Sequence, residues 1–330
     1  MISECQDWRP TADLRVLRLR AQLLAETRAF FAAGKVLEVE TPALSSAATT
    51  DPQLDSFVTR FTGPGANSGR MLYLQTSPEF AMKRLLAAGS GSIYQVARVF
   101  RDGEVGARHN PEFVLLEWYR VGYDYHQLMA EVDQLVTTLL RDHIVLAPSE
   151  RLSYRQAFQQ YLQLDPHTVT VAELRDCVEQ QGLSVAAMPG GDLDMWRDLL
   201  LSHCIEPRLG KGRLTFIYDY PASQAALARI RMGAPPVAER FELYCSGIEL
   251  ANGFQELTDH VEQRKRFLQD NRQRATRGKL EVTLDERFLA ALAAGLPDCA
   301  GVALGFERLV MIAADVPELQ QASAFCFDRA

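Results

Sequence analysis

The sequence predicts an α+β protein in which strands near both ends of the chain are separated by a long helical stretch. Residues Ile93–Arg101 are rich in β-branched and aromatic side chains, and a charged loop ending at Pro111 leads into a second strand that runs to Tyr119. Helical patterns then occupy roughly residues 125–210, and strand patterns return from Leu214 onward. We therefore expect α+β architecture with a helical insertion in the middle of the chain.

Further elements are expected before this strand pair. Apolar residues recur at helical spacing over Thr11–Ala33, where Thr11 or Asp13 can cap the start and Gly34 the end. A short strand over Val36–Thr41 ends before a proline. Two more strands and a helix that opens at Ser77 follow, over Asp55–Phe61, Met71–Leu74 and Thr76–Ala88.

The helical insertion is followed by a second group of strands. Its strands are expected at Leu214–Tyr218, Phe241–Cys245 and Ile248–Glu256. The last two form a hairpin around Ser246-Gly247, whereas Ala147–Arg151, inside the insertion, is expected to be a loop. The last elements are a basic helix over Asp259–Gly278, a glycine-punctuated strand near Gly301–Arg308 and a helix over Leu309–Ala314.

Composition excludes several classes of protein. The chain has 330 residues, of which 47% are hydrophobic and 23% charged, as in an ordinary globular protein. The net charge of −7 argues against a protein that coats nucleic acid, which needs clustered Lys and Arg. The six cysteines form no CxxC pair, so neither a zinc site nor a disulfide framework is indicated, and a reducing cytoplasm fits. The polar N-terminus carries no secretory signal, and no apolar run approaches the roughly 20 residues of a membrane span.

One face of the second strand of the pair combines several chemically useful side chains. Side chains alternate along a strand, so Phe113, Leu115, Glu117 and Tyr119 share a face toward which Arg101 can also point. A guanidinium suits phosphate oxygens and a ring suits a nucleotide base. A carboxylate beside a phenol suits an amine-bearing substrate. The alternative is an ordinary amphipathic hairpin whose charges are solvated.

The later hairpin carries two more carboxylates. If its loop spans four residues, Tyr244–Gly247, then Glu242 faces Glu249, and the pair needs a cation, for which Mg²⁺ on nucleotide phosphates is the natural choice. The alternative is two exposed glutamates on an edge. Asn252 and Glu256 share one face by parity.

The face of Glu249 stays open at this point. Alternation along the strand places the side chain of Glu249 on the other face of the sheet from Asn252 and Glu256, unless Gly253 marks a β-bulge. Glu79 is similarly ambiguous, because a first-turn glutamate either complements the helix dipole or receives a substrate ammonium.

The remaining candidates are cations. Arg308, at the start of the last helix, can hold a phosphate with help from the helix dipole. The basic helix is by default a solvated face, and a partner-docking face is the alternative. Its cations are Arg264, Lys265, Arg266, Arg272, Arg274 and Arg277.

Three stretches match one family pattern. Gly34–Pro42 resembles motif 1 of the class II aminoacyl-tRNA synthetases, Phe100–Tyr119 resembles motif 2 and Gly305–Arg308 resembles motif 3. The segments HNPEF (His109–Phe113) and NGFxEL (Asn252–Leu257) look like lysyl-tRNA synthetases. The resemblance covers nearly the whole chain. It implies the class II synthetase catalytic fold, an antiparallel sheet flanked by helices, and a homodimer.

A narrower resemblance follows from the length of the chain. Few residues precede the first expected helix, so we expect one catalytic domain over residues 1–330 and no anticodon-binding domain. Such a compact core resembles the family of elongation factor P–(R)-β-lysine ligases. This resemblance implies a cytoplasmic ligase that uses ATP and Mg²⁺ to activate (R)-β-lysine as an adenylate. The acyl group would then pass to a lysine ε-amine of elongation factor P, a protein with the shape of a tRNA, and tRNA itself would not be a substrate.

The resemblance also implies a role for each matching residue. The ATP-binding residues would be Arg101, Asp102, Gly103, Asn110, Phe113, Glu249, Leu250, Gly305 and Arg308. Arg101 and Arg308 would be catalytic, and Glu242 and Glu249 would bind Mg²⁺. The amino acid would contact Ser77, Pro78, Glu79, Glu117, Tyr119, Asn252, Glu256 and Ala303.

Two positions depart from the family pattern. Gly103 stands where motif 2 has a glutamate two residues after the arginine, and Glu104 follows it. Ala303 stands where lysyl-tRNA synthetases commonly have glycine, which would reshape the pocket and favour a β-amino acid.

Three other functions stay open. They are a truncated lysyl-tRNA synthetase that charges tRNA, an ammonia-dependent asparagine synthetase and a non-catalytic regulatory paralogue. An ammonium-directed Glu256 with Tyr119 argues against an aspartate substrate. The joint presence of Arg101, Phe113, Glu249 and Arg308 argues against a non-catalytic paralogue, which would have no need of a nucleotide site.

Overall fold

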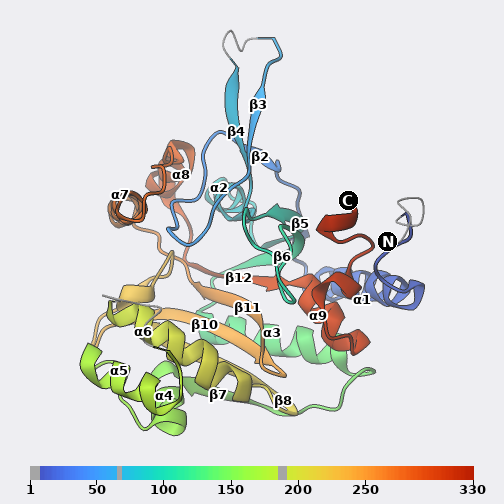
Figure 1. Ribbon diagram of the computed structural model, residues 1–330. Coiled ribbons are helices and arrows are strands. Elements are labelled where there is room, and N and C mark those ends of the chain that lie inside the picture. Colours follow the sequence, from blue (N-terminus) through green and yellow to red (C-terminus); the bar gives the residue numbers. More distant parts are fainter. Residues whose placement is uncertain (1–7, 65–68, 185–191) are drawn as a thin grey trace, which may run out of the picture. The chain divides into compact units, whose positions relative to one another are not determined.

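The computed structural model describes residues 8–64, 69–184 and 192–330, which group into two compact units. The first unit comprises the residues up to Gly122, Thr258–Cys299 and Ala303–Ala330, and the second comprises Tyr123–Leu257 and Ala300–Val302. Each unit mixes helices with strands that are mostly antiparallel, so the predicted α+β class is confirmed (Figure 1).

The first unit contains the helices and strands on which motifs 1, 2 and 3 lie. Its helices are α1 (Leu14–Ala33), α2 (Glu79–Ala87), α7 (His260–Thr276), α8 (Glu286–Gly295) and α9 (Phe306–Ala314). Its strands are β1 (Leu37–Glu38), β2 (Leu44–Ser45), β3 (Val58–Phe61), β4 (Arg70–Leu74), β5 (Ile93–Phe100), β6 (Glu112–Val121) and most of β12 (Cys299–Gly305).

The predicted strand pair is confirmed as the centre of this unit. Strands β5 and β6 are antiparallel over their whole length, from Ile93 opposite Tyr119 to Phe100 opposite Glu112. The order of neighbouring strands is β1-β5-β6-β12, with β1 parallel to β5, and β2, β4 and β3 form a separate three-stranded sheet. Helix α1 is joined to the pair through Phe31, whose ring stacks on Tyr94 with 4.3 Å between centroids.

Local signals at the helix ends explain where the elements begin. The side chain of Asp13 accepts the N–H of Arg15 at the start of α1, and Gly34 ends the helix, as the sequence predicts. Asp259 caps α7 in the same way. The expected strand over Val36–Thr41 is only the two residues of β1. None of the helices in the described part of the chain is long and apolar enough to cross a bilayer.

The second unit contains the predicted helical region and the later strands. Its helices are α3 (Tyr125–Leu140), α4 (Tyr154–Leu162), α5 (Val171–Gln180) and α6 (Leu193–Leu200), the last continued by a π-helical turn, Leu201–Ile205. Its strands are β7 (Ala147–Ser153), β8 (Arg213–Pro221), β9 (Ile230–Arg231), β10 (Val237–Cys245) and β11 (Ile248–Gln255). The order is β11-β10-β8-β7, with β9 beside β10 and β12 beside β11.

The expected loop at Ala147–Arg151 is wrong, because this segment belongs to β7. It pairs in parallel with β8, with Glu150 opposite Thr215 and Ser153 opposite Tyr218. The sequence APSERLS lacks the alternation of a half-buried strand. Its proline is tolerated because β7 is the last strand of the order and has one side without a ladder partner.

The expected pairing of Glu242 with Glu249 is also wrong. The loop between β10 and β11 has two residues, because Cys245 pairs with Ile248. Ser246 and Gly247 have φ values of 53° and 72°, the two positive φ angles of a type I′ turn. With this short turn Glu249 lies opposite Tyr244.

A β-bulge decides which face Glu249 takes. Leu243 pairs with Ala251 and Tyr244 with Glu249, so Leu250 is the extra residue in β11. The extra residue inverts the parity, and Glu249 therefore joins Asn252 on the face that also carries Glu242. The bulge that the sequence left open exists, at Leu250 and not at Gly253.

Gly253 itself has a packing role. A Cβ at this position would lie 2.6 Å from the ring of Phe241, 2.7 Å from the Cβ of Val302 and 2.8 Å from the carbonyl oxygen of Gly301. Real Cβ atoms do not approach backbone this closely. Glycine is therefore needed where β11 lies against β12.

We expect Gly253→Ala to destabilise the protein by about 1–3 kcal/mol, because the added methyl must displace backbone of β12. Thermal unfolding followed by circular dichroism would measure this as a lower Tm. Gly34→Ala is the control, since a Cβ there finds only ordinary contacts of 3.6 Å or more and φ is −78°. Equal Tm values for Gly253→Ala and the parent would contradict the prediction.

Candidate functional site

Arg101 and Phe113 come together in the first unit, as the sequence predicts. Arg101 follows the last residue of β5, and its N–H donates to the carbonyl oxygen of Pro111 (2.9 Å). The guanidinium lies over the ring of Phe113, with its carbon 5.0 Å from the centroid, and Nε donates to the carbonyl oxygen of Thr76 (3.4 Å). The end of β5 and the start of β6 therefore present a guanidinium stacked over an aromatic ring.

The glutamate that follows Gly103 reaches the same arginine. Glu104 Oε1 lies 3.6 Å from Nη1 of Arg101, in a partly exposed ion pair. Gly103 has a φ of +82°, a conformation that side chains other than glycine rarely adopt. The backbone conformation thus explains why no glutamate stands at position 103, and it places the carboxylate of Glu104 beside Arg101.

Arg308 is held by a histidine that the sequence analysis did not assign. Its Nη2 lies 3.1 Å from Nε2 of His109. A guanidinium only donates, so Nε2 accepts and the proton of the neutral imidazole is on Nδ1. Burial and then the charge of Arg308 lower the pKa of His109, which keeps the ring neutral.

Gly305, just before α9, is not required by the packing of the first unit. The nearest atoms to a Cβ placed there belong to the side chain of Arg308, at 3.5 Å or more. Ala303 lies at the other departure from the family pattern, on β12, and packs with Phe113 against a small cluster of Ala97, Val99 and Leu115.

Glu307 is a positioning residue that the sequence analysis missed. Its carboxylate is buried, with Oε1 accepting from Nη2 of Arg20 on α1 and Oε2 accepting the N–H of Val114 on β6, both at 2.9 Å. Val114 follows Phe113 and Glu307 precedes Arg308. One carboxylate therefore fixes the relative positions of the ring and of the second arginine.

Ser77, Glu117 and Tyr119 form a second cluster in the first unit. The hydroxyl of Tyr119 donates to Oε1 of Glu117 (2.6 Å), and the hydroxyl of Ser77 donates to Oε2 (2.7 Å). Ser77 also accepts the N–H of Glu79 (3.0 Å), although the N-terminal cap of α2 is Pro78. The predicted carboxylate and phenol are thus in direct contact.

Glu117 is a carboxyl group with an unusual pKa. It is 2% exposed, and burial together with the charge of Glu79 raises its pKa to about 7, although the hydrogen bonds from Tyr119 and Ser77 act in the opposite direction. The carboxyl group of Glu117 therefore gains or loses its proton near neutral pH.

Glu79 is paired with a cation inside the protein. Nζ of Lys83 lies 2.5 Å from Oε1 of Glu79, and Lys83 is 1% exposed. The sequence analysis missed this pair, although the spacing of four residues on one helix was a usable signal. A glutamate that already has an ammonium partner is not by itself a receptor for a substrate ammonium.

Asn110 and Asp102 both make hydrogen bonds within the first unit. The amide of Asn110 donates to the carbonyl oxygen of Glu112 (2.6 Å) and accepts the N–H of Phe327 (3.3 Å). Asp102 donates its N–H to the carbonyl oxygen of Asp55 (2.8 Å). Both contacts shape the loop between β5 and β6.

In the second unit Glu242 is the acceptor at the centre of a polar network. Its Oε2 accepts from the hydroxyls of Tyr220 (2.6 Å) and Tyr244 (2.5 Å). Its Oε1 accepts from Nη2 of Arg240 (2.5 Å) and from the amide of Asn252 (3.2 Å). Burial and the charge of Glu242 raise the pKa of both tyrosines well above the usual value, so both remain donors.

These contacts do not fit Glu242 as an open ligand for Mg²⁺. Each of the two carboxylate oxygens of Glu242 already accepts two hydrogen bonds. One of the four donors is the guanidinium of Arg240, whose positive charge repels a dication. No group of three or more His, Cys, Asp or Glu side chains arranged for a metal ion occurs within the described ranges. Mg²⁺ often takes only one or two carboxylates and completes its shell with phosphates and water, and Glu249 lies on the same face of the hairpin.

The other second-unit candidates lie on or just after β11. Leu250 is buried at the bulge, and Asn252 bridges Nε of Arg240 and Oε1 of Glu242 with its amide. Glu256 is a buried carboxylate just beyond the end of the strand, where it pairs with Ala228 in an isolated bridge.

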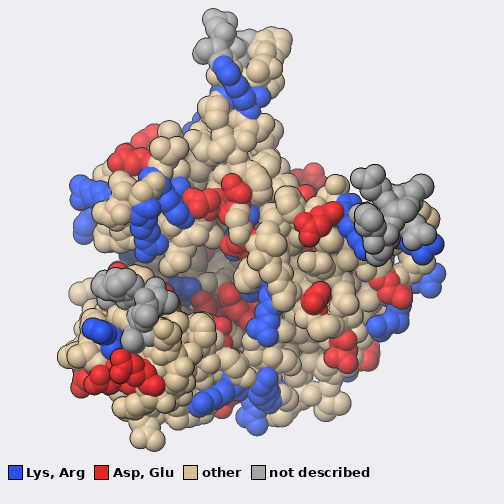
Figure 2. Space-filling model, in the orientation of Figure 1, with Lys and Arg blue, Asp and Glu red and all other residues tan. Residues whose placement is uncertain are grey.

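The alternative interpretation of the basic helix as a docking face does not hold for most of its cations. Lys and Arg side chains gather over this helix in Figure 2, but most have partners within the first unit. Arg264 pairs with Glu286, and Lys265 and Arg266 pair with Glu262.

Arg274 was expected to be exposed, either on a solvated face or on the alternative docking face, and it is instead 5% exposed. Its guanidinium is hydrogen-bonded within the first unit, so it is not available to a partner. Arg272 and Arg277 are exposed and make no ion pair with any residue in the described part of the chain.

The sequence matches known proteins over its full length. Residues 4–329 match the family described as tRNA synthetases class II (D, K and N). Two similar relatives are the proteins named elongation factor P–(R)-β-lysine ligase of Salmonella gallinarum and of Salmonella paratyphi B. Each is 52% identical over 329 residues, which covers 100% of this chain and 100% of the relative.

A third relative with the same name, from Salmonella choleraesuis, has the same identity and coverage. The family match spans the strand pair with Arg101 and Phe113 as well as the start of α9 with Arg308. This chain therefore belongs to the class II tRNA synthetases of the D, K and N group.

Proposed function

We propose that this chain is an ATP-dependent ligase that activates (R)-β-lysine and joins it to a lysine ε-amine of elongation factor P. The observation that carries the proposal is the 52% identity, over the whole of both chains, to proteins named for that reaction. The first unit supports it with a cation beside an aromatic ring and with a carboxyl beside a phenol.

The first step we assign is formation of an adenylate. The carboxylate of the amino acid attacks the α-phosphorus of ATP, and pyrophosphate leaves with the electrons of the broken P–O bond. Arg101 and Arg308 donate N–H groups to phosphate oxygens whose charge grows in the transition state, and Phe113 stacks on the adenine. Both arginines are held in advance, by Glu104 and by His109. Catalysis here is therefore positioning and charge stabilisation.

The second step is transfer to the protein lysine. The uncharged ε-amine attacks the acyl carbonyl, AMP leaves with the electrons of the acyl–phosphate bond, and the amine loses a proton as the amide forms. No covalent bond to the enzyme is needed in either step.

Recognition of a diamino acid is assigned to the carboxyl groups. Glu117 accepts one substrate ammonium when it is ionised, with Tyr119 and Ser77 holding its two oxygens. Glu79 and Lys83 form an ion pair with no net charge, and we assign to this pair only a steric role beside Ser77, Glu117 and Tyr119. From the second unit we assign Asn252 and Glu256 to the amino acid.

ATP binding also uses Asp102, Gly103, Asn110, Glu249, Leu250 and Gly305 in this proposal. The support for Gly305 is that internal packing leaves room for a side chain there, so the absence of one serves a close approach by a ligand. When bound, Mg²⁺ would neutralise phosphate charge, and Glu249 is the carboxylate we assign to it. Because Glu242 is saturated by internal donors, no step is assigned to a metal at that residue. We also propose that the chain acts as a homodimer.

The proposal is tested by mass spectrometry of elongation factor P after incubation with the enzyme, ATP and (R)-β-lysine. A single β-lysyl mass addition is the expected result. Pyrophosphate exchange with lysine, (R)-β-lysine and aspartate, measured side by side, tests the first step alone. Efficient charging of tRNA without modification of elongation factor P would overturn the proposal in favour of a lysyl-tRNA synthetase.

We expect Arg101→Ala to lower pyrophosphate exchange by about 100-fold or more, because the variant loses N–H donors to the reacting phosphate. Arg98→Ala is the matched control, since Arg98 is exposed on β5 and its one ion pair among the described residues is with the half-buried Glu112. Near-normal exchange in a folded Arg101→Ala protein would rule out this role.

We expect kcat/KM for the amino acid to rise by up to about tenfold between pH 6 and pH 8. The pKa of Glu117 is about 7, so the group carries its proton below that pH and can pair with an ammonium only above it. Glu117→Gln should lower kcat/KM and abolish its rise between pH 6 and pH 8, which is the limb of the pH profile that we assign to Glu117.

Calorimetry in two buffers of different ionisation enthalpy gives an independent measure of the same event. Binding of the amino acid at pH 6 should release close to one proton in the parent and none in Glu117→Gln. A pH limb that persists unchanged in Glu117→Gln would assign the titration to another group.

We expect the double charge reversal Arg272→Glu/Arg277→Glu to slow transfer to elongation factor P and to leave pyrophosphate exchange intact. The two arginines are the α7 cations without an internal ion pair among the described residues, so they are the ones available to an acidic partner. The parent's rate of transfer should also fall as salt rises, since the Debye length shrinks from about 10 Å at 0.1 M to about 3 Å at 1 M. A normal rate of transfer in the double variant would remove α7 from the docking surface.

A further inference from the structure

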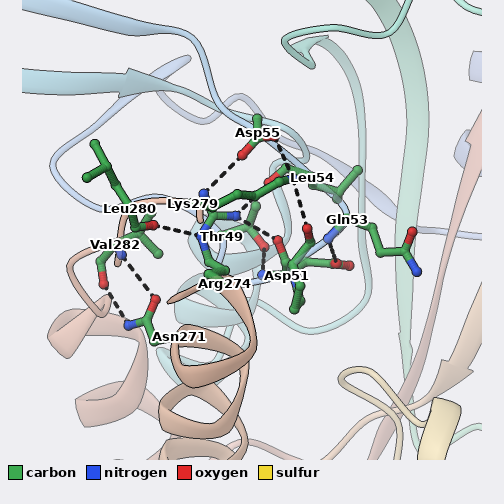
Figure 3. A network of polar contacts seen from close by, with 11 residues as sticks. Thr49, Asp51, Gln53, Leu54, Asp55, Asn271, Arg274, Lys279, Leu280 and Val282 are labelled. Carbon is green, nitrogen blue, oxygen red and sulfur yellow. Dashed lines mark hydrogen bonds and ion pairs between the residues drawn. The ribbon is translucent and has the colours of Figure 1, made fainter. Parts of the chain in front are cut away.

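Arg274 is a buried cation that ties the end of α7 to the loop of residues 51–55 (Figure 3). All three of its nitrogens donate hydrogen bonds, so the side chain has one geometry. The acceptors are the carbonyl oxygens of Leu280 (3.0 Å), Asp51 (2.9 Å) and Leu54 (3.0 Å) and the Oδ1 of Asp55 (3.0 Å).

Asp55 is the acceptor that two cations share. Its Oδ1 takes the bond from Arg274, and its Oδ2 accepts from Nζ of Lys279 (2.7 Å). Lys279 donates in addition to the carbonyl oxygen of Pro52 (2.9 Å). Burial raises the pKa of Asp55, but the bonds and charges of Lys279 and Arg274 outweigh it and lower the pKa, so the carboxylate stays ionised.

The main chain of Asp55 makes the next connection. Its carbonyl oxygen accepts the N–H of Asp102 at 2.8 Å. Asp102 follows Arg101 and precedes Gly103, so the bond holds the segment Arg101–Gly103, to which we assign ATP binding. A residue fixed by two cations through its side chain thus fixes that loop through its backbone.

We propose that Arg274 and Lys279 are positioning residues for ATP binding, acting through Asp55 on the loop Arg101–Gly103. The inference rests on the proposed function, because it takes ATP as the ligand of this loop. We call Arg274, Lys279 and Asp55 together the clamp. The two cations hold the side-chain carboxylate of Asp55, and the backbone carbonyl of Asp55 holds the N–H of Asp102. Small displacements of a positioning group cost rate and affinity steeply, which is why a clamp outside the site matters to it.

The inference is tested by the Kd of ATP, measured by calorimetry on folded variants, and by KM in pyrophosphate exchange. We expect Asp55→Asn and Arg274→Lys each to raise the Kd and KM of ATP by about tenfold, and Lys279→Met by about threefold, because each loosens the clamp without removing Asp102 or Arg101. KM for the amino acid should change by less than about twofold. The double variant Asp55→Asn/Arg274→Lys should be little worse than either single variant, because both break one interaction.

Arg264→Met is the matched control. Arg264 lies on the same helix and forms a close ion pair with Glu286, but both side chains are exposed. It should leave the Kd of ATP unchanged.

Variants with a lowered Tm and a Kd of ATP within about twofold of the parent would show that the clamp serves stability alone, and would overturn the inference. If Arg274→Lys does not fold, Asp55→Asn and Lys279→Met decide by the same criterion. A parent protein that neither binds ATP nor exchanges pyrophosphate would overturn the proposed function and the inference with it. A parent that does both, with unaffected clamp variants, would overturn the inference alone.

Discussion

The candidate site of the first unit depends on one buried carboxylate, that of Glu307. A carboxylate without water is tolerated only when it is paired and hydrogen-bonded, and Glu307 meets this requirement with the guanidinium of Arg20 and the backbone N–H of Val114. The requirement ties α1, β6 and the first turn of α9 to one point. Because Val114 and Glu307 are each next to a residue of the proposed ATP site, satisfying the buried charge also sets the site.

Other ionic groups of the proposed sites also have internal partners, whether they are buried or partly exposed. Arg101 lies beside Glu104, Lys83 beside Glu79, and Arg240 beside Glu242. Each charge is therefore oriented before a substrate arrives, which lowers the entropy lost on binding. A bound phosphate or ammonium must share or replace an internal partner. Glu117 differs from these pairs, since its partners are two hydroxyls and its own proton is in exchange near neutral pH.

Much of the first unit could be predicted from the sequence, because its signals are local. The alternation along Glu112–Val121 placed Phe113, Glu117 and Tyr119 on one face. Asp13 was one of the two caps expected for the first helix, and the expected basic helix began at Asp259, which is its N-cap in the structure. The strand β7 could not be predicted, since an edge strand with a proline carries no alternation and exists only because β8 pairs with it. Arg274 was misplaced for a similar reason. Helical spacing alone did not show that the loop 51–55 would supply acceptors for it. The roles assigned to ATP and amino-acid residues came from resemblance and remain predictions.

The hairpin of β10 and β11 has a consequence for how this part of the chain can vary in length. The two-residue turn at Ser246-Gly247 and the extra residue at Leu250 together determine that Glu249 and Asn252 share a face. Loss or gain of one residue in β11 between Glu249 and Asn252 would reverse the alternation of the residues before the change and turn Glu249 to the other side of the sheet from Asn252. Single substitutions between Glu249 and Asn252 are therefore compatible with this arrangement, whereas insertions and deletions are not. Homologous chains that keep a carboxylate on this face should keep the number of residues between it and the asparagine even where their sequences differ.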